Sequence, residues 1–203
     1  MKNSRNIWDY IFRPFQFVAG GKALILGIVT MFVLVALCYA SNTFFDGAID
    51  AHYGCKEKAI LPHVYCVFGV WVVMTVLFYL TALLAGSKKT RLIDIAGTLA
   101  LAKLPLIVFA LIGFLPMTKA LCGLDLTNFN PMDTETTRQI MMVAVKMLPT
   151  LFVCLLAVIW YIVLMYNGYS VSVNLRGTKG ILTFIAALLV SEILAKMLLG
   201  IVL

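Results

Sequence analysis

The only two histidines of the chain each stand three residues before a cysteine, as His52-x2-Cys55 and His63-x2-Cys66. Zinc takes four His or Cys ligands in a tetrahedron, usually as close pairs with a short gap between their members. Seven residues separate the two pairs, and a loop of that length can fold back on itself. The spacing is therefore compatible with a zinc site formed by His52, Cys55, His63 and Cys66.

The same cysteines are also candidates for a disulfide. Cys122 stands in another polar segment, and disulfides form readily where a loop faces an oxidising compartment. A bond between two of Cys55, Cys66 and Cys122 would compete with metal binding. The sequence leaves three alternatives open for this stretch: no special role, a disulfide, or a zinc site.

Three ionisable residues, Lys103, Glu192 and Lys196, stand within apolar runs. A charge at the centre of a bilayer costs about 2.5–3.5 kcal/mol on insertion scales, so such residues usually have a structural or functional role. Lys103 and Glu192 lie at similar depths at a rise of about 1.5 Å per residue, and Glu192 precedes Lys196 by four residues, which suits a pair on one helix. We predict that Glu192 pairs with Lys103, Lys196 or both. This polar site either holds the helices in register or binds an ion, a proton or a lipid headgroup.

The elements that must position these groups are too apolar for a water-soluble domain. Of the 203 residues, 63% are hydrophobic and 12% are charged, against about 45–50% and about 25% in soluble domains. The apolar runs reach the roughly 17–25 residues that a helix needs to cross a bilayer. The sequence therefore predicts an all-α polytopic membrane bundle that forms a single domain over residues 1–203. Its five transmembrane helices are expected at about 24–41, 64–86, 95–116, 142–166 and 181–203.

A separate amphipathic pattern precedes the first span. In RNIWDYIFRPFQFVA, residues 5–19, apolar side chains recur at helical spacing with polar and charged residues between them. Such a helix lies in the headgroup layer of a membrane. Pro14 is expected to break it or to begin its second half.

The basic residues are divided unevenly between the predicted loops. Nine fall in the N-terminal segment, the 87–94 loop and the 167–180 loop, whereas four fall in the 42–63 and 117–141 loops. Because basic loops remain in the cytoplasm, we predict a cytoplasmic N-terminus and an outward-facing C-terminus. This bias accounts for the net charge of +7, so we expect no nucleic-acid partner.

Two segments carry a resemblance to a known family: RLIDIAGTLALAKLP at 91–105 and YNGYSVSVNLRGTKGILTFIAALLVSEILAK at 166–196. Together with Pro14-Phe15 before the first span, they make the chain resemble the Yip family, named for Ypt/Rab-interacting proteins. The resemblance implies five spans and a cytoplasmic N-terminus. The Asp-Leu-Tyr-Gly-Pro segment of the eukaryotic, Rab-associated members is absent here. The bacterial-type branch, in the bacterial cytoplasmic membrane, is therefore the expected relative and location.

Two classes of function remain. The first is a non-enzymatic membrane organiser that contacts membrane lipids and a membrane-protein partner or a second copy of itself. The alternative is a small transporter or channel that uses Lys103, Glu192 and Lys196. An enzyme is not expected, because the sequence has no nucleophile–base pair at a useful spacing and no phosphate-binding glycine loop. Small residues on the third and fifth spans allow close helix contacts, within or between chains; they are Ala96, Gly97, Ala100, Ala186 and Ala187.

Overall fold

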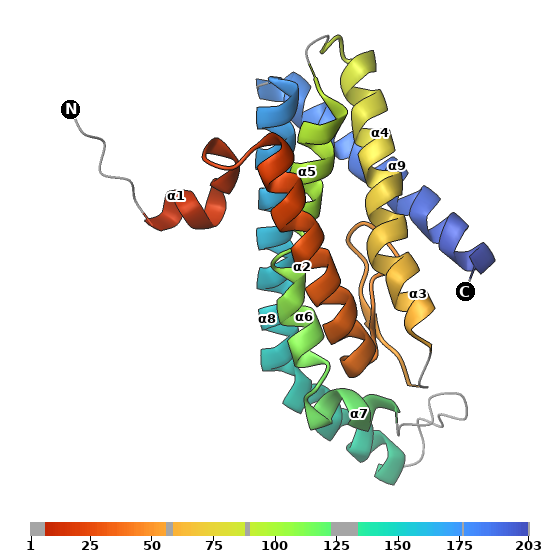
Figure 1. Ribbon diagram of the computed structural model, residues 1–203. Helices are drawn as coiled ribbons and strands as arrows, with labels where there is room; N and C mark the ends of the chain where they lie inside the picture. The colour runs from red at the N-terminus through yellow and green to blue at the C-terminus, as the bar shows by residue number, and fades with distance from the viewer. Residues whose placement is uncertain (1–6, 56–58, 88–89, 123–133, 176, 203) are drawn as a thin grey trace.

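The computed structural model describes residues 7–55, 59–87, 90–122, 134–175 and 177–202 (Figure 1). Five helical units in these ranges are long and apolar enough to cross a membrane, so the predicted all-α polytopic bundle is confirmed. The units are α2 (Gly20–Ser41); α3 (Ile60–Val64), the π-helical turn η2 (Tyr65–Gly69) and α4 (Val70–Leu84); α5 (Leu92–Ala102) and α6 (Leu106–Ile112); α8 (Thr134–Val173); and α9 (Gly177–Val202).

The third unit lies at the centre of the bundle, with α5 and α6 between α2 and α8 (Figure 1). In its most apolar stretch 72% of the residues are buried, against at most 33% in the other four. Small residues permit this central position. A Cβ added at Gly27 of α2 would stand 2.5 Å from the Cβ of Ala100, and one at Gly97 would stand 2.8 Å from the backbone nitrogen of Leu24. The close contacts of Gly97 and Ala100 are therefore made within one chain.

The third span is interrupted between α5 and α6. The N–H of Leu106 donates to the carbonyl of Lys103 at 2.9 Å, a bond across three residues where a regular α-helix would have four. Pro105 causes the break, because it has no N–H and its ring does not fit within a continuous helix. The single span expected at 95–116 thus consists of two helices, and Lys103 stands where they meet.

The segment after α2 enters the bundle, although the sequence suggested an external loop. Strand β1 (Thr43–Phe44) pairs antiparallel with β2 (His52–Tyr53). We call residues 43–53 the inserted hairpin; they run upward beside α2 and α4 in Figure 1. Five of them are buried, and the Tyr53 hydroxyl donates to the carbonyl of Phe109 in α6 at 3.3 Å. Non-helical backbone is tolerated at membrane depth only where protein surrounds it, as here.

The predicted loop at 167–180 is mostly helical. Helix α8 continues to Val173 and α9 begins at Gly177. The polar side chains that suggested a loop contact other helices: Asn167 Nδ2 donates to the carbonyl of Phe12 at 2.7 Å, and Ser172 Oγ lies 3.4 Å from Thr98 Oγ1. The predicted boundary was wrong because polarity in this segment reflects contacts with Phe12 and with α5.

The N-terminal segment forms two short helices, α1 (Ile7–Phe12) and η1 (Pro14–Gln16). Pro14 opens the second, and residues 5 and 6 of the predicted helix lie outside the described ranges. In Figure 1, α1 projects sideways from the bundle, across the direction of the long helices. Helix α7 (Pro116–Cys122) follows α6 at the opposite end of the bundle (Figure 1).

Candidate functional site

Glu192 and Lys196 lie one turn apart on α9 and meet the inserted hairpin. The Lys196 ammonium is 3.4 Å from Glu192 Oε1 and 2.5 Å from Asp50 Oδ2. Glu192 Oε2 also accepts a hydrogen bond from the N–H of Ile49 at 3.0 Å. An added Cβ at Gly47 would overlap the Glu192 carboxylate, so the hairpin backbone lies directly against it. We call Asp50, Glu192 and Lys196 the hairpin cluster, because together they hold the hairpin to α9.

Electrostatics favour the charged form of Asp50, which lies outside the spans. The hydrogen bond from Lys196 lowers the pKa of Asp50 below its usual value, and this effect exceeds the opposing effect of burial. Hydrogen bonding to an ionised carboxylate stabilises that form relative to the neutral acid. The hairpin cluster therefore keeps its contact between Asp50 and Lys196 at neutral pH.

Lys103 occupies a different place from the hairpin cluster. Its side chain is 1% exposed, and its ammonium lies 6.0 Å from the centroid of the Tyr161 ring. The buried thiols of Cys38 and Cys66 lie near it. Among the described residues no ion pair includes Lys103. The structure thus brings Glu192 to Lys196 and to the hairpin, and leaves Lys103 over an aromatic ring, a favourable cation–π arrangement.

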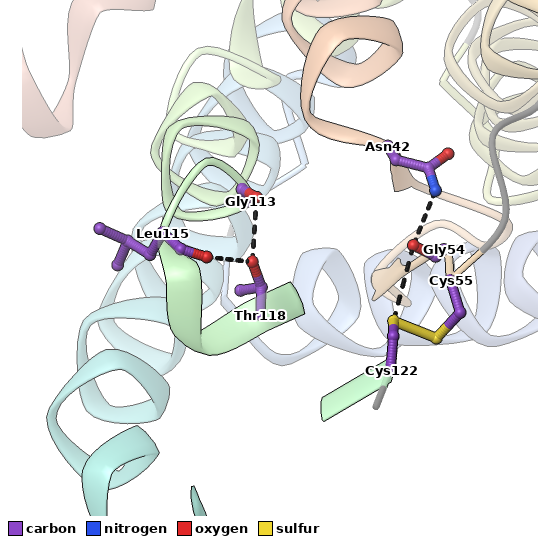
Figure 2. The surroundings of a disulfide bond; sticks show 7 residues. All are labelled: Asn42, Gly54, Cys55, Gly113, Leu115, Thr118 and Cys122. Atoms are coloured by element: carbon purple, nitrogen blue, oxygen red, sulfur yellow. Dashed lines mark hydrogen bonds between the residues drawn. A yellow bond between two sulfur atoms is a disulfide. The ribbon is translucent and has the colours of Figure 1, made fainter. Parts of the chain in front are cut away.

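Cys55, two residues after the inserted hairpin, forms a disulfide with Cys122 of α7 (Figure 2). The bond joins positions 67 residues apart, with a Cα–Cα distance of 5.1 Å. Figure 2 also shows Asn42 Nδ2 donating to the carbonyl of Gly54 at 2.7 Å. Asn42 ends α2 with a left-handed backbone (φ 54°), which asparagine adopts more readily than most residues. The disulfide and this hydrogen bond fasten the base of the hairpin to α7 and α2.

The two histidines pack against Phe44. Ring centroids of His52 and His63 lie 5.3 Å and 4.2 Å from that of Phe44. Cys66 is a buried thiol in η2. Within the described part of the chain, no three His, Cys, Asp or Glu side chains gather closely enough to hold a metal ion. A zinc site using all four predicted ligands would require reduction of the disulfide and movement of the hairpin.

A polar pocket of about 610 Å³ opens beside the disulfide. Residues from the end of α2, the hairpin and α6–α7 line it, and Lys119 is the charged residue among them. Thr118 forms part of its wall and donates to the carbonyls of Gly113 and Leu115 (Figure 2). Sequence reasoning missed this pocket because its residues come from three separate segments. The cysteines at 55 and 122 were the signal that these segments meet.

The fold and its apolar surface define a polytopic α-helical membrane protein. A family model, the Yip1 domain, matches residues 8–198. The match covers nearly the whole chain, so the protein belongs to the Yip1 domain family and is an integral membrane protein. The family resemblance inferred from the sequence is confirmed, and the bacterial branch and the orientation stay predictions. No curated protein and no solved structure matches the chain.

Proposed function

We propose that this protein is a non-enzymatic membrane organiser that holds a short amphipathic helix in the cytoplasmic headgroup layer, at a fixed angle to its bundle. The observation that carries this proposal is the attachment of α1 to α8. Trp160 Nε1 donates to the carbonyl of Ile11 at 3.1 Å, and Asn167 Nδ2 donates to the carbonyl of Phe12 at 2.7 Å. Both bonds reach the backbone of α1, so they fix its position whatever its outward side chains contact.

The outward side chains of α1 are apolar and aromatic. Ile7 is 68% exposed and Trp8 is 58% exposed, and Tyr10, Phe12 and Phe17 are also exposed. Aromatic side chains favour the interface between headgroups and acyl chains. Phe15, in contrast, is 2% exposed and lies against Gly168 of α8. The segment therefore presents one set of rings to lipid and uses another to attach itself to the bundle.

The charge bias supports the proposed orientation. The end of the bundle that carries α1 also holds the last turn of α8, where Ser87 Oγ donates to the carbonyl of Val173 at 2.6 Å. In the sequence, the N-terminal, 87–94 and 167–180 segments contain nine basic residues, against four in the 42–63 and 117–141 segments, which favours the cytoplasmic side for this end. A helix held in one leaflet adds volume to that leaflet alone, and such helices are sensitive to curvature. Membrane lipids are the first proposed partner, and a protein partner or a second copy would extend the same role.

Reconstitution into vesicles tests the proposal. We expect the full chain to change the mean vesicle diameter, measured by electron cryomicroscopy at a fixed protein-to-lipid ratio. Replacing Ile7 and Trp8 by Glu should abolish most of that change, because charged side chains leave the headgroup layer for water. Ile60→Glu is the matched control, since Ile60 is 51% exposed at the start of α3, at the opposite end of the bundle. Folded Ile7→Glu/Trp8→Glu protein that alters vesicle diameter as the wild type does would refute the proposal.

Transport is the second candidate function, and Lys103 is the observation that favours it. Ionisable residues within spans often mark ion pathways, and interrupted helices form the binding sites of many transporters. Lys103 combines both features. Proton or anion flux into liposomes, compared between the wild type, Lys103→Met and Glu192→Gln, tests this candidate. Wild-type flux equal to that of protein-free liposomes would exclude it.

A further inference from the structure

An apolar groove of about 440 Å³ lies beneath α1. Ile11 and Phe12 of α1 form its roof, Val108 of α6 forms one wall, and α8 forms the floor. No charged side chain is among the residues that line it. We call it the α1 groove. Its volume falls within the range of about 300–1,000 Å³ that is usual for ligand pockets.

The groove is held open by the protein itself. The two hydrogen bonds that fix α1 come from Trp160 and Asn167, and both stand on α8, which also supplies the floor. Roof and floor are thus joined by two bonds at 3.1 Å and 2.7 Å. A site that is already formed binds without the cost of ordering its walls.

The surroundings of the groove identify its occupant. Leu156 and Ile159, on the α8 side of the groove, are each 49% exposed, so it opens on the apolar outer surface of the bundle. In a bilayer that surface faces acyl chains. An acyl chain gains little hydrophobic energy by moving from bulk lipid to an equally apolar groove, so preference among lipids must come from the headgroup.

An exposed cation stands at the end of the roof. Arg13 directly follows Phe12 and is exposed. Its guanidinium has the fork geometry that suits phosphate oxygens. Asp9 lies four residues before it on α1, but within the described ranges no ion pair joins the two. Arg13 is therefore placed to meet an anionic headgroup whose chain enters the groove.

We propose that the α1 groove binds an anionic phospholipid, with one acyl chain between α1 and α8 and the headgroup on Arg13. This inference rests on the proposed function, because it requires α1 to lie in the headgroup layer. It adds a lipid class and a defined binding site to that role. A lipid held there would occupy the junction between α1 and the bundle.

Native mass spectrometry of the full chain tests the proposal. Protein purified with equal amounts of phosphatidylglycerol and phosphatidylcholine should retain phosphatidylglycerol preferentially. Arg13→Gln should reduce that preference about fivefold, since one basic residue near a membrane surface contributes about 1 kcal/mol to anionic lipid binding. Lys179→Gln, which removes an exposed cation from the first turn of α9, is the matched control. Equal retention of the two lipids by the wild type would overturn the proposal.

Filling the groove provides the second arm. Ala157 lines the groove and is 5% exposed, so Ala157→Phe should abolish lipid retention, whereas Ala186→Phe on the exposed side of α9 should not. If Ala157→Phe does not fold, Leu156→Trp, at a half-exposed lining position, tests whether filling the groove abolishes lipid retention. Unchanged phosphatidylglycerol retention in a folded groove variant would overturn the site. Vesicle diameters measured on the same variants separate the two proposals. If a variant loses the lipid but still changes vesicle diameter as the wild type does, only a role of the lipid in shaping the membrane is refuted. If the protein retains the lipid but leaves vesicle diameter equal to that of protein-free vesicles, only the proposed function is refuted.

Discussion

Helices α2 and α5 are held together by close packing of small residues, whereas α9 and the inserted hairpin are held together by charges and hydrogen bonds. Gly27, Gly97 and Ala100 bring the two helix backbones into close contact. At the hairpin cluster, a carboxylate, an ammonium and a backbone N–H supply the contact.

The difference follows from the backbone hydrogen bonds that a helix and a hairpin each still need in lipid. A helix already pairs its backbone groups internally, so two helices associate through close packing, which small residues permit. The hairpin has few internal ladder bonds, and its remaining N–H groups need partners at membrane depth. The helix contact should therefore be sensitive to added volume, and the hairpin contact to a lost polar group. Four predictions test this comparison.

Gly27→Leu should have the largest effect. Its side chain would meet the backbone of Leu101, whose nitrogen is 2.7 Å from an ideal Cβ at position 27. Since backbone cannot move aside as a flexible side chain can, we expect a loss of about 3 kcal/mol. The free energy of unfolding in mixed detergent micelles measures this. Gly21→Leu on the same helix is the control, because a Cβ there meets nothing within 4 Å. Equal losses in both variants would contradict the packing explanation.

Removing the disulfide should have the next largest effect. Cys55→Ser/Cys122→Ser frees a connection between positions 67 residues apart, and we expect a loss of about 2 kcal/mol, at the lower end of the usual range because the spans already restrict the chain. Thermal melting measures the loss. Reductant should lower the melting temperature of the wild type to that of the variant and leave the variant unchanged. A rise on adding zinc to the reduced wild type, absent in His63→Ala, would instead support the zinc hypothesis.

Glu192→Ala should have a smaller effect, about 1–2 kcal/mol, because it leaves the N–H of Ile49 without its charged acceptor. Glu192→Gln keeps an acceptor for that N–H and should lose less. The exposed neighbour Ile193→Ala is the control. The same unfolding assay applies. If Glu192→Gln and Glu192→Ala were equally destabilised, the charge of Glu192, rather than its acceptor oxygen, would hold the hairpin.

Acidification should have the smallest effect, because Asp50 and Lys196 remain 42% and 46% exposed. The pKa of Asp50 is lower in the folded protein than its usual 3.8. Its contribution is fully present above pH 3.8 and is lost as the pH falls through the folded-state pKa, since the unfolded chain takes up the proton first. Melting temperatures of the wild type and Asp50→Asn, compared between pH 6 and pH 3, should therefore converge. A constant difference across this range would exclude Asp50 as the titrating group.

The parts of the site that lie within one helix were accessible to sequence reasoning. Glu192 and Lys196 are four residues apart, and a helix places such residues on one face whatever surrounds it. Lys103 was matched to Glu192 by depth alone. Depth in the membrane does not specify the direction in which a side chain projects around the helix axis. The break at Pro105 also changes the direction of the helix that follows it. The structure places Lys103 over Tyr161 instead.

The sequence by itself determined the membrane class, the five spans and the family of this protein, because hydropathy and helical length are local properties of the chain. Only the tertiary structure decided that the segment after α2 enters the bundle, that Cys55 meets Cys122, and that α1 covers a groove on α8. These contacts join residues far apart in sequence. They depend on the backbone and packing partners that each segment finds once the helices have assembled, which local patterns do not encode.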